Sequence, residues 1–134
     1  MIKIVIISHG NLGKELLATA ENILGKQEDL VVVALGTNSL SSVCGETENI
    51  LRTIDSSSGA LILTDMLGGT PCNACLPFCD KYNIEIISGM NLYMVLSACI
   101  NRPQMVLREL AQKVIQDGRK NIANAKEMFL QRLK

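Results

Sequence analysis

The only histidine of the chain, His9, is the first candidate for chemistry. It ends an apolar run rich in Ile and Val, and Gly10 and Asn11 follow it directly. A lone histidine more often packs or faces solvent than reacts. At the end of a buried strand and before a helix, however, a neutral imidazole is an exposed nucleophile, and nearby backbone N–H groups can face an anion. One such imidazole is enough to accept a phosphoryl group and release it again, because the N–P bond is of high energy.

A second set of polar and small residues follows the apolar run 60–64. The Asp65 carboxylate can accept a hydrogen bond from one imidazole nitrogen, which fixes the tautomer and stabilises positive charge on the ring. Alternatively, Asp65 only caps its loop. Gly68 and Gly69 permit a close approach of the backbone to an oxyanion. The Thr70 hydroxyl can bond a phosphoryl oxygen, cap the following helix, or do both.

Strands and helices position these residues, and the sequence predicts them from short apolar runs that alternate with segments of helical periodicity. Strands are predicted over 2–7, 30–35, 60–64 and 84–87, and helices over 12–24, 39–54, 71–82, 92–100 and 104–117, the last stopped by Gly118. The tail 119–134 fits an amphipathic helix, and a short strand near 121–123 is an alternative. This alternation is typical of βαβ units, so we expect an α/β fold.

The expected architecture is an open, doubly wound, mainly parallel sheet with helices on both faces. The common strand order for this size is 2-1-3-4, with a possible fifth edge strand. In such sheets, ligands lie beyond the carboxyl ends of the strands where the order switches, here between strands 1 and 3. The loops that carry His9 and Asp65 should therefore face each other.

Length and composition narrow the range of functions. The 134 residues predict one domain over 1–134, and 48% hydrophobic with 19% charged residues excludes a disordered chain. Thirteen basic and thirteen acidic residues give no net charge, which argues against a nucleic-acid binder, as does an aromatic content of 3%. The opening apolar run is too short for a signal peptide or a membrane span. Five cysteines without a secretion signal indicate reduced thiols in the cytoplasm.

The cysteines Cys72, Cys75 and Cys79 raise the alternative of a metal or redox site. Zinc sites usually take four ligands, and Cys-x-x-Cys pairs normally lie on turns or helix starts. Buried thiols on a core-facing helix are the simpler interpretation, so we expect no metal. The chain also lacks the glycine-rich Gly-x-x-x-x-Gly-Lys-Ser/Thr motif, which argues against direct use of ATP.

Three motifs together resemble one family. They are Ile6-Ile7-Ser8-His9-Gly10, Asp65-Met66-Leu67-Gly68-Gly69-Thr70-Pro71 and Ser88-Gly89-Met90-Asn91-Leu92. In order and approximate spacing, over about residues 1–118, the chain is similar to the enzyme IIA proteins of the mannose-type sugar phosphotransferase system. The resemblance implies that His9 is phosphorylated, that Asp65 is its hydrogen-bond partner, and that Gly68, Gly69 and Thr70 surround the phosphoryl group.

The resemblance also implies partners. Family members take phosphate from the histidine-containing phosphocarrier protein and pass it to a IIB protein or domain, without a metal or organic cofactor. They are usually homodimers, and the apolar residues of the tail (Met128, Phe129, Leu130 and Leu133) fit a dimer contact. This chain holds no IIB domain, so the expected acceptor is a separate polypeptide and the expected contact with the membrane is only through a permease. The sequence does not reveal which sugar is carried.

Some features depart from the family pattern. Tyr93 stands where many relatives have proline, the third helix is rich in cysteine, and the tail looks more helical than the exchanged strand of some relatives. The main alternative is a phosphotransfer subunit of a phosphoenolpyruvate-dependent dihydroxyacetone kinase, which would keep His9 but deliver phosphate to a nucleotide. A non-enzymatic regulator is a further class, and it would fail to pass phosphate onward.

Overall fold

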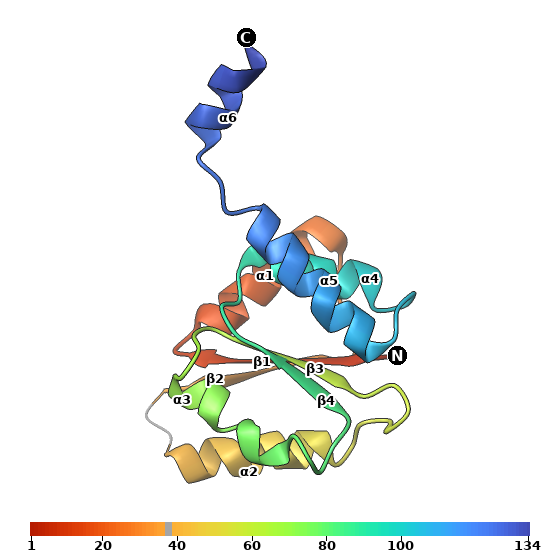
Figure 1. The fold of residues 1–134 in the computed structure, drawn as a ribbon. Coiled ribbons are helices and arrows are strands. Elements are labelled where there is room, and N and C mark those ends of the chain that lie inside the picture. Colours follow the sequence, from red (N-terminus) through yellow and green to blue (C-terminus); the bar gives the residue numbers. More distant parts are fainter. Residues whose placement is uncertain (37–38) are drawn as a thin grey trace.

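The computed structural model describes residues 1–36 and 39–134, which form a four-stranded sheet between two layers of helices (Figure 1). The strands are β1 (Lys3–His9), β2 (Leu30–Leu35), β3 (Ala60–Thr64) and β4 (Ile84–Ile87). They are parallel and lie in the order β2-β1-β3-β4, which confirms the predicted α/β topology. Because all four strands run in one direction, their carboxyl ends lie at one edge of the sheet.

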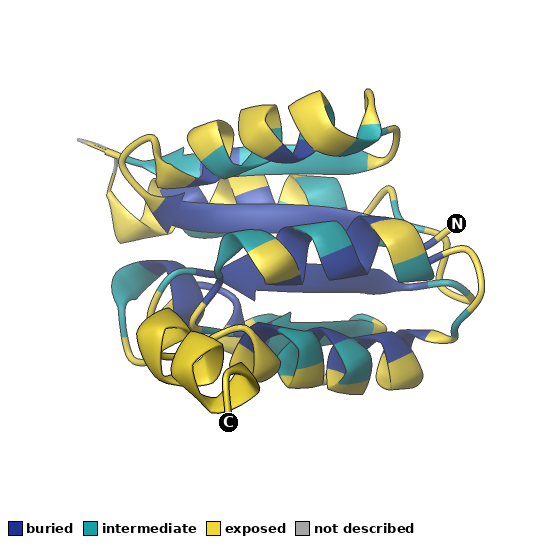
Figure 2. Cartoon of the chain, turned by 90° about the horizontal axis from the view of Figure 1, so that it is seen from above, coloured by how far each residue is buried: buried dark blue, intermediate teal, exposed yellow. Residues whose placement is uncertain are grey.

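Helices cover both faces of the sheet. They are α1 (Leu12–Leu24), α2 (Leu40–Leu51), α3 (Thr70–Asn73), the 3₁₀ turn η1 (Leu76–Phe78), α4 (Leu92–Asn101), α5 (Leu107–Lys120) and α6 (Ala125–Arg132). Alternate strand residues face opposite layers. Ile4 and Ile6 pack with α1, α4 and α5, whereas Val5 and Ile7 pack with α2 and the segment between α3 and η1. Figure 2 shows the buried strands between helices whose outer sides are exposed.

The third helix is much shorter than the predicted 71–82. It ends at Asn73, and only the turn η1 follows. Pro77 explains the break, because it lacks a backbone N–H and disfavours the helical conformation at the residue before it. The prediction that Thr70 caps this helix is also wrong: the N-cap residue is Gly69, and no side chain caps the first turn.

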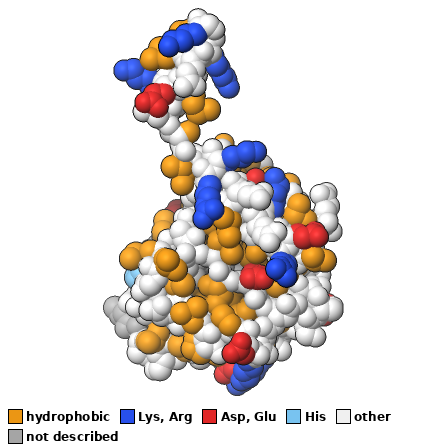
Figure 3. Space-filling model, in the orientation of Figure 1, with side chains coloured by type: hydrophobic (Ala, Val, Ile, Leu, Met, Phe, Trp, Pro, Cys, Tyr) orange, Lys and Arg blue, Asp and Glu red, His pale blue; other side chains and the backbone are white. Residues whose placement is uncertain are grey.

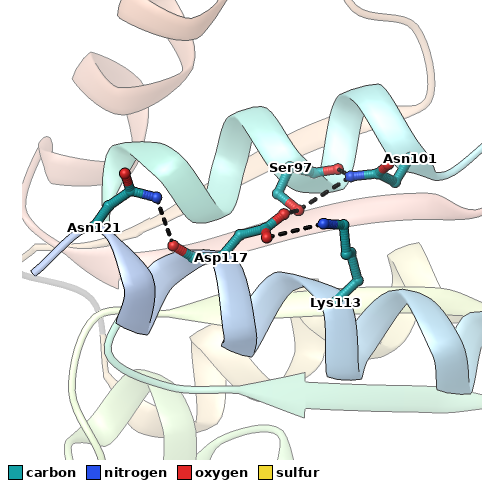
Figure 4. Close-up of polar contacts among 5 residues, drawn as sticks. All are labelled: Ser97, Asn101, Lys113, Asp117 and Asn121. Atoms are coloured by element: carbon teal, nitrogen blue, oxygen red, sulfur yellow. Dashed lines mark hydrogen bonds and ion pairs between the residues drawn. The ribbon is translucent and has the colours of Figure 1, made fainter.

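Helices α4 and α5 are held together by a close approach and by a polar network (Figure 4). The prediction that Gly118 ends the fifth helix is wrong, because the glycine lies inside α5. A Cβ at Gly118 would lie 2.5 Å from Met94 Cγ, so only glycine permits this packing. Directly before this glycine, Asp117 accepts hydrogen bonds from Ser97 Oγ at 2.7 Å and from Lys113 Nζ at 3.0 Å.

The possible fifth edge strand near 121–123 does not form. Asn121 Nδ2 donates to the carbonyl oxygen of Asp117 at 2.7 Å, and the Asn124 side chain accepts from the Glu127 N–H at 3.1 Å. The first hydrogen bond stabilises the C-terminal end of α5, and the second caps the N-terminus of α6. Both favour helix ends in this segment instead of an extended strand. The alternative of a helical tail is the one that the structure bears out.

The tail projects from the body of the chain (Figure 1). All of its residues from 119 to 134 are exposed, including Phe129 and Leu133. Within residues 1–36 and 39–134, every helix is too short or too polar to cross a bilayer.

Candidate active site

His9 and Asp65 are in direct contact at the carboxyl edge of the sheet. His9 is the last residue of β1, and Asp65 follows β3, the parallel neighbour of β1. The Nδ1 atom of His9 lies 2.7 Å from Asp65 Oδ2, and the His9 backbone N–H donates to the same oxygen at 2.9 Å. A carboxylate only accepts hydrogen bonds, so in the neutral ring Nδ1 carries the proton and Nε2 keeps its lone pair.

The environment of Asp65 favours its ionised form. Burial acts to raise the pKa of this carboxyl, whose side chain is 10% exposed. Hydrogen bonds from the backbone and the imidazole of His9 outweigh burial, so the pKa of Asp65 lies below its ordinary value. The Met66 N–H donates to the second oxygen, Oδ1, at 3.0 Å. Asp65 is therefore negatively charged near neutral pH and can stabilise positive charge on the imidazole.

The reactive side of the imidazole faces outward. The His9 side chain is 48% exposed, and its Nε2 forms no hydrogen bond with any residue that the structure describes. Figure 3 shows the histidine at the left margin of the molecule, beside hydrophobic side chains. A nucleophilic nitrogen with a fixed tautomer is thus open to a second molecule.

The backbone around His9 is anchored to three elements. The His9 N–H bonds Asp65, and the Gly10 N–H donates to the Leu35 carbonyl oxygen at the end of β2 at 2.8 Å. The buried Ser8 Oγ accepts from the Gly13 N–H in the first turn of α1 at 2.8 Å. Asn11, the N-cap residue of α1, makes no side-chain hydrogen bond to the first turn of the helix. Ser8, at the end of β1, supplies the acceptor for one N–H group of this turn instead.

Ser8 is the residue that sequence reasoning missed. Its signal was a polar side chain at the end of an otherwise apolar strand, two residues before a glycine-containing turn. Gly13 belongs to the same feature, because a Cβ there would lie 2.7 Å from Ile6 Cγ2 and 3.0 Å from Ser8 Oγ. Close packing of α1 on β1 therefore requires glycine at this position.

The predicted anion-binding loop lies beside the imidazole. A Cβ on Gly69 would lie 3.2 Å from His9 Cε1, the ring atom bonded to Nε2. Gly68 has a φ of +77°, a conformation that glycine adopts without strain. Thr70 begins α3 directly after these glycines. The structure thus brings His9, Asp65 and Gly69 together and places Gly68 directly before Gly69 and Thr70 at the start of α3, whereas their roles toward a phosphoryl group stay predictions.

Three cysteines lie in and directly after the helix that follows this loop. Cys72 and Cys75 are buried, Cys79 is exposed, and no three His, Cys, Asp or Glu side chains of the described residues assemble as metal ligands. Burial, together with the neighbouring thiols, raises the pKa of Cys75 to about 12. A thiol that resists ionisation is a poor nucleophile, so the structure supports a packing role for Cys75.

Comparison with protein families gives one match that spans most of the chain. The model of the family described as PTS system fructose IIA component matches residues 3–115. The mannose-specific EIIAB component of Escherichia coli K12 is 32% identical over 124 residues, which are 90% of this chain and 38% of that protein. The chain thus spans well under half the length of this curated relative.

Shorter relatives and solved structures agree with this match. The fructose-specific EIIA component of Bacillus subtilis 168 is 26% identical over 82% of this chain and 77% of its own. A phosphotransferase system EIIA component from Streptococcus agalactiae superposes with a TM-score of 0.89 at 31% identity, covering 95% of this chain and 99% of that one. The mannose/sorbose specific IIA subunit from Enterococcus faecalis gives a TM-score of 0.85 at 29% identity, covering 92% and 93%.

Proposed function

The chain belongs to the mannose-type IIA family of the sugar phosphotransferase system, and from this premise we propose that it is a phosphoryl carrier that is phosphorylated on His9. The observation that carries the proposal is the pairing of His9 Nδ1 with the ionised Asp65 carboxylate at 2.7 Å, which leaves Nε2 as an exposed nucleophile. The proposed donor is the histidine-containing phosphocarrier protein. The proposed acceptor is a IIB component of a sugar permease.

In the proposed reaction, the lone pair of His9 Nε2 attacks the phosphorus atom carried by the donor. The new Nε2–P bond forms as the donor N–P bond breaks, and the electron pair of that bond returns to the donor nitrogen. Asp65 stabilises the positive charge that develops on the ring, and it holds the ring in the attacking orientation. The second transfer, to the IIB component, repeats this exchange with His9 as the donor.

The glycine loop would receive the transferred group. A Cβ on Gly69 would lie 3.2 Å from His9 Cε1, next to Nε2, so the absence of a side chain there leaves room for phosphoryl oxygens. The backbone of Gly68, in the loop, and Thr70, at the start of α3, would donate hydrogen bonds. Both partners exchange an already activated N–P bond, so the proposal requires only positioning and charge stabilisation, with no metal or organic cofactor.

We further propose that residues 1–134 form a single domain and that the carrier is a cytoplasmic homodimer. The exposed tail, with Met128, Phe129, Leu130 and Leu133, offers apolar surface for a second copy. Cytoplasmic action follows from the proposed donor, which obtains its phosphate from phosphoenolpyruvate in that compartment. The matched relatives are named for mannose, fructose and sorbose systems, and no observation favours the dihydroxyacetone kinase alternative.

The test is a reconstituted relay. The protein is incubated with labelled phosphoenolpyruvate, the phosphocarrier protein and the kinase of that carrier, then separated and mixed with a IIB component. The proposal expects label to enter the chain and to leave it for the IIB component. Label that enters but stays on the chain would support a regulator instead, and label that never enters would refute the carrier function.

A further inference from the structure

The tail has the opposite charge to the rest of the chain. Residues 1–118, which we call the body, contain eight basic and twelve acidic side chains and carry a net charge of −4. The tail, residues 119–134, contains five basic side chains and one acidic side chain and carries a net charge of +4. The whole chain has no net charge only because a basic tail balances an acidic body, and a basic segment of this kind indicates an anionic partner. The five basic residues are Arg119, Lys120, Lys126, Arg132 and Lys134.

The basic side chains of the tail are open to such a partner. Every residue from 119 to 134 is exposed. Figure 3 shows basic and hydrophobic side chains next to each other on the projecting tail. Within the part of the chain that the structure describes, the ion pairs join other side chains, and none of the five tail cations takes part in one.

Helix α6 arranges these charges around an apolar face. Phe129 and Leu133 lie one turn apart on the same side of the helix, and they are 61% and 69% exposed. Lys126 and Arg132 stand three residues before and after Phe129, so they lie beside this face. Glu127, two residues before Phe129, lies about 160° around the helix from it. Basic side chains beside an apolar face, with the acidic one turned away, are typical of a helix that lies on a membrane surface.

An anionic lipid surface fits both features of the tail. Its negative potential attracts Lys and Arg side chains, whose long stems reach the headgroups while apolar neighbours become buried. A nucleic acid would match the charge, but it would leave Phe129 and Leu133 in water. Helix α6 has only eight residues, so apolar burial alone gives a weak contact and charge must supply much of the binding.

We propose that the tail is an anchor that binds the surface of bilayers containing anionic phospholipid. Phe129 and Leu133 enter the boundary between the headgroups and the acyl chains, and Lys126 and Arg132 lie at the level of the lipid phosphates. This contact goes beyond the proposed carrier function and beyond the permease contact expected from the sequence, and it requires no phosphoryl transfer. It would hold the carrier at the membrane that contains its permease.

The anchor and the proposed homodimer use the same segment. Both contacts bury the apolar side chains of the tail, so binding to lipid replaces the contact of the tail with a second copy. The two contacts are therefore alternative states of the tail, and an anionic membrane should favour the first of them.

The experiment measures cosedimentation of the full chain with vesicles. One set of vesicles contains phosphatidylcholine alone, and the other contains equal parts of phosphatidylcholine and anionic phosphatidylglycerol. Lys126→Gln combined with Arg132→Gln removes two charges beside the apolar face. Lys26→Gln combined with Arg108→Gln is the matched control, because it removes the same two charges from exposed positions of the body.

A second pair of variants tests the apolar face. Phe129→Ser removes an apolar side chain from the tail. Ile23→Ser is its control, because Ile23 is 58% exposed near the end of α1 in the body. All of these side chains are exposed, so every variant should keep the fold, and thermal melts check this.

The wild-type chain should bind the anionic vesicles at least about tenfold more tightly than the neutral ones, and high salt should weaken this binding. The double charge variant of the tail and Phe129→Ser should each lose about tenfold or more in affinity. Both control variants should stay within about threefold of the wild type.

Several results would overturn the anchor. A wild-type chain that stays in solution with anionic vesicles would show that a second copy, and not lipid, covers the tail. Wild-type affinity of Phe129→Ser would indicate a contact of charge alone, as with a nucleic acid. An equal loss of affinity in the two double charge variants would show that lipid responds to the overall charge of the chain and not to the tail.

Discussion

The substitution Gly69→Ala tests the geometry of the site without removing a reactive group. Gly69 has φ −74° and ψ 164°, which alanine adopts without strain. The new Cβ would lie 3.2 Å from His9 Cε1 and 3.1 Å from Met66 Cγ. Ordinary carbon contacts lie at about 3.5–4.0 Å, so the imidazole must move by a few tenths of an ångström. It moves away from the loop that we propose receives the phosphoryl group.

The size of the effect follows from the precision that transfer requires. A displacement of about 1 Å costs about 10²-fold in rate, so a few tenths should slow phosphorylation of His9 by about 3- to 10-fold. The lost volume beside Nε2 adds to this, and we expect a total of about 10- to 30-fold, or about 1.4–2 kcal/mol. Stability should hardly change, because replacing glycine at an ordinary φ gains about 0.4–1 kcal/mol, which offsets the contact.

The assay combines quench-flow phosphorylation with thermal melts on the same preparations. Gly45→Ala is the control, because Gly45 lies inside α2 with no atom within 4 Å of a new Cβ. That variant should keep the wild-type rate and should melt slightly higher. A Gly69→Ala protein that melts normally and accepts phosphate at the wild-type rate would show that the loop does not border the transferred group.

Other variants test the role of Asp65, the proposed homodimer and the buried hydrogen bonds of Arg102. Asp65→Asn should slow phosphorylation by about 10²- to 10⁴-fold in quench-flow while the fold persists, and a lowered melting temperature with an unchanged rate would mean that Asp65 only caps its loop. Since the pKa of Asp65 is lowered on folding, its contribution to stability is present at neutral pH and is lost as the pH falls through that lowered value; the difference in melting temperature between wild type and Asp65→Asn should therefore begin to shrink below about pH 3.9, the ordinary pKa in the unfolded chain, and should vanish only below the lowered pKa of the folded state. Light scattering should find a dimer for the full chain and a monomer for a version cut after Gly118, and a full-length monomer at micromolar concentration contradicts the proposed homodimer. Arg102→Met should lower stability by about 3 kcal/mol, and hence the melting temperature by roughly 10 °C, because Arg102 is 4% exposed and its guanidinium donates to the carbonyl oxygens of Ile2, Glu28 and Asp29. A melting temperature within about 2 °C of wild type would show that these bonds are replaced by water.

The strands could be predicted well because each is a short, nearly continuous apolar run. The ranges 30–35, 60–64 and 84–87 agree with the structure, and the first strand extends through His9 instead of ending at residue 7. Burial on both faces of a parallel sheet demands such runs, so the pattern is strong. The contact of His9 with Asp65 followed from strand order alone, since strands 1 and 3 are neighbours.

The incorrect secondary-structure predictions arise where a local sequence signal competes with tertiary packing or with a second local signal. Pro77 ends the third helix early, although the apolar pattern continues to about residue 82. Gly118 resembles a helix stop in sequence, but close packing against Met94 is what requires the glycine. Ser8 was overlooked because its role, bonding the Gly13 N–H, depends on how α1 folds back over β1. Such contacts between distant backbone segments leave little signal in one sequence.

Intact-mass measurement shows whether His9 carries the phosphoryl group. The wild-type chain and His9→Ala are incubated with and without the phosphocarrier protein, its kinase and phosphoenolpyruvate, and each product is then exposed to acid and to base. We expect one added phosphoryl group per wild-type chain, lost in acid and kept in base, and none on His9→Ala. Phosphate that persists on His9→Ala, or a wild-type product that survives acid, would contradict it.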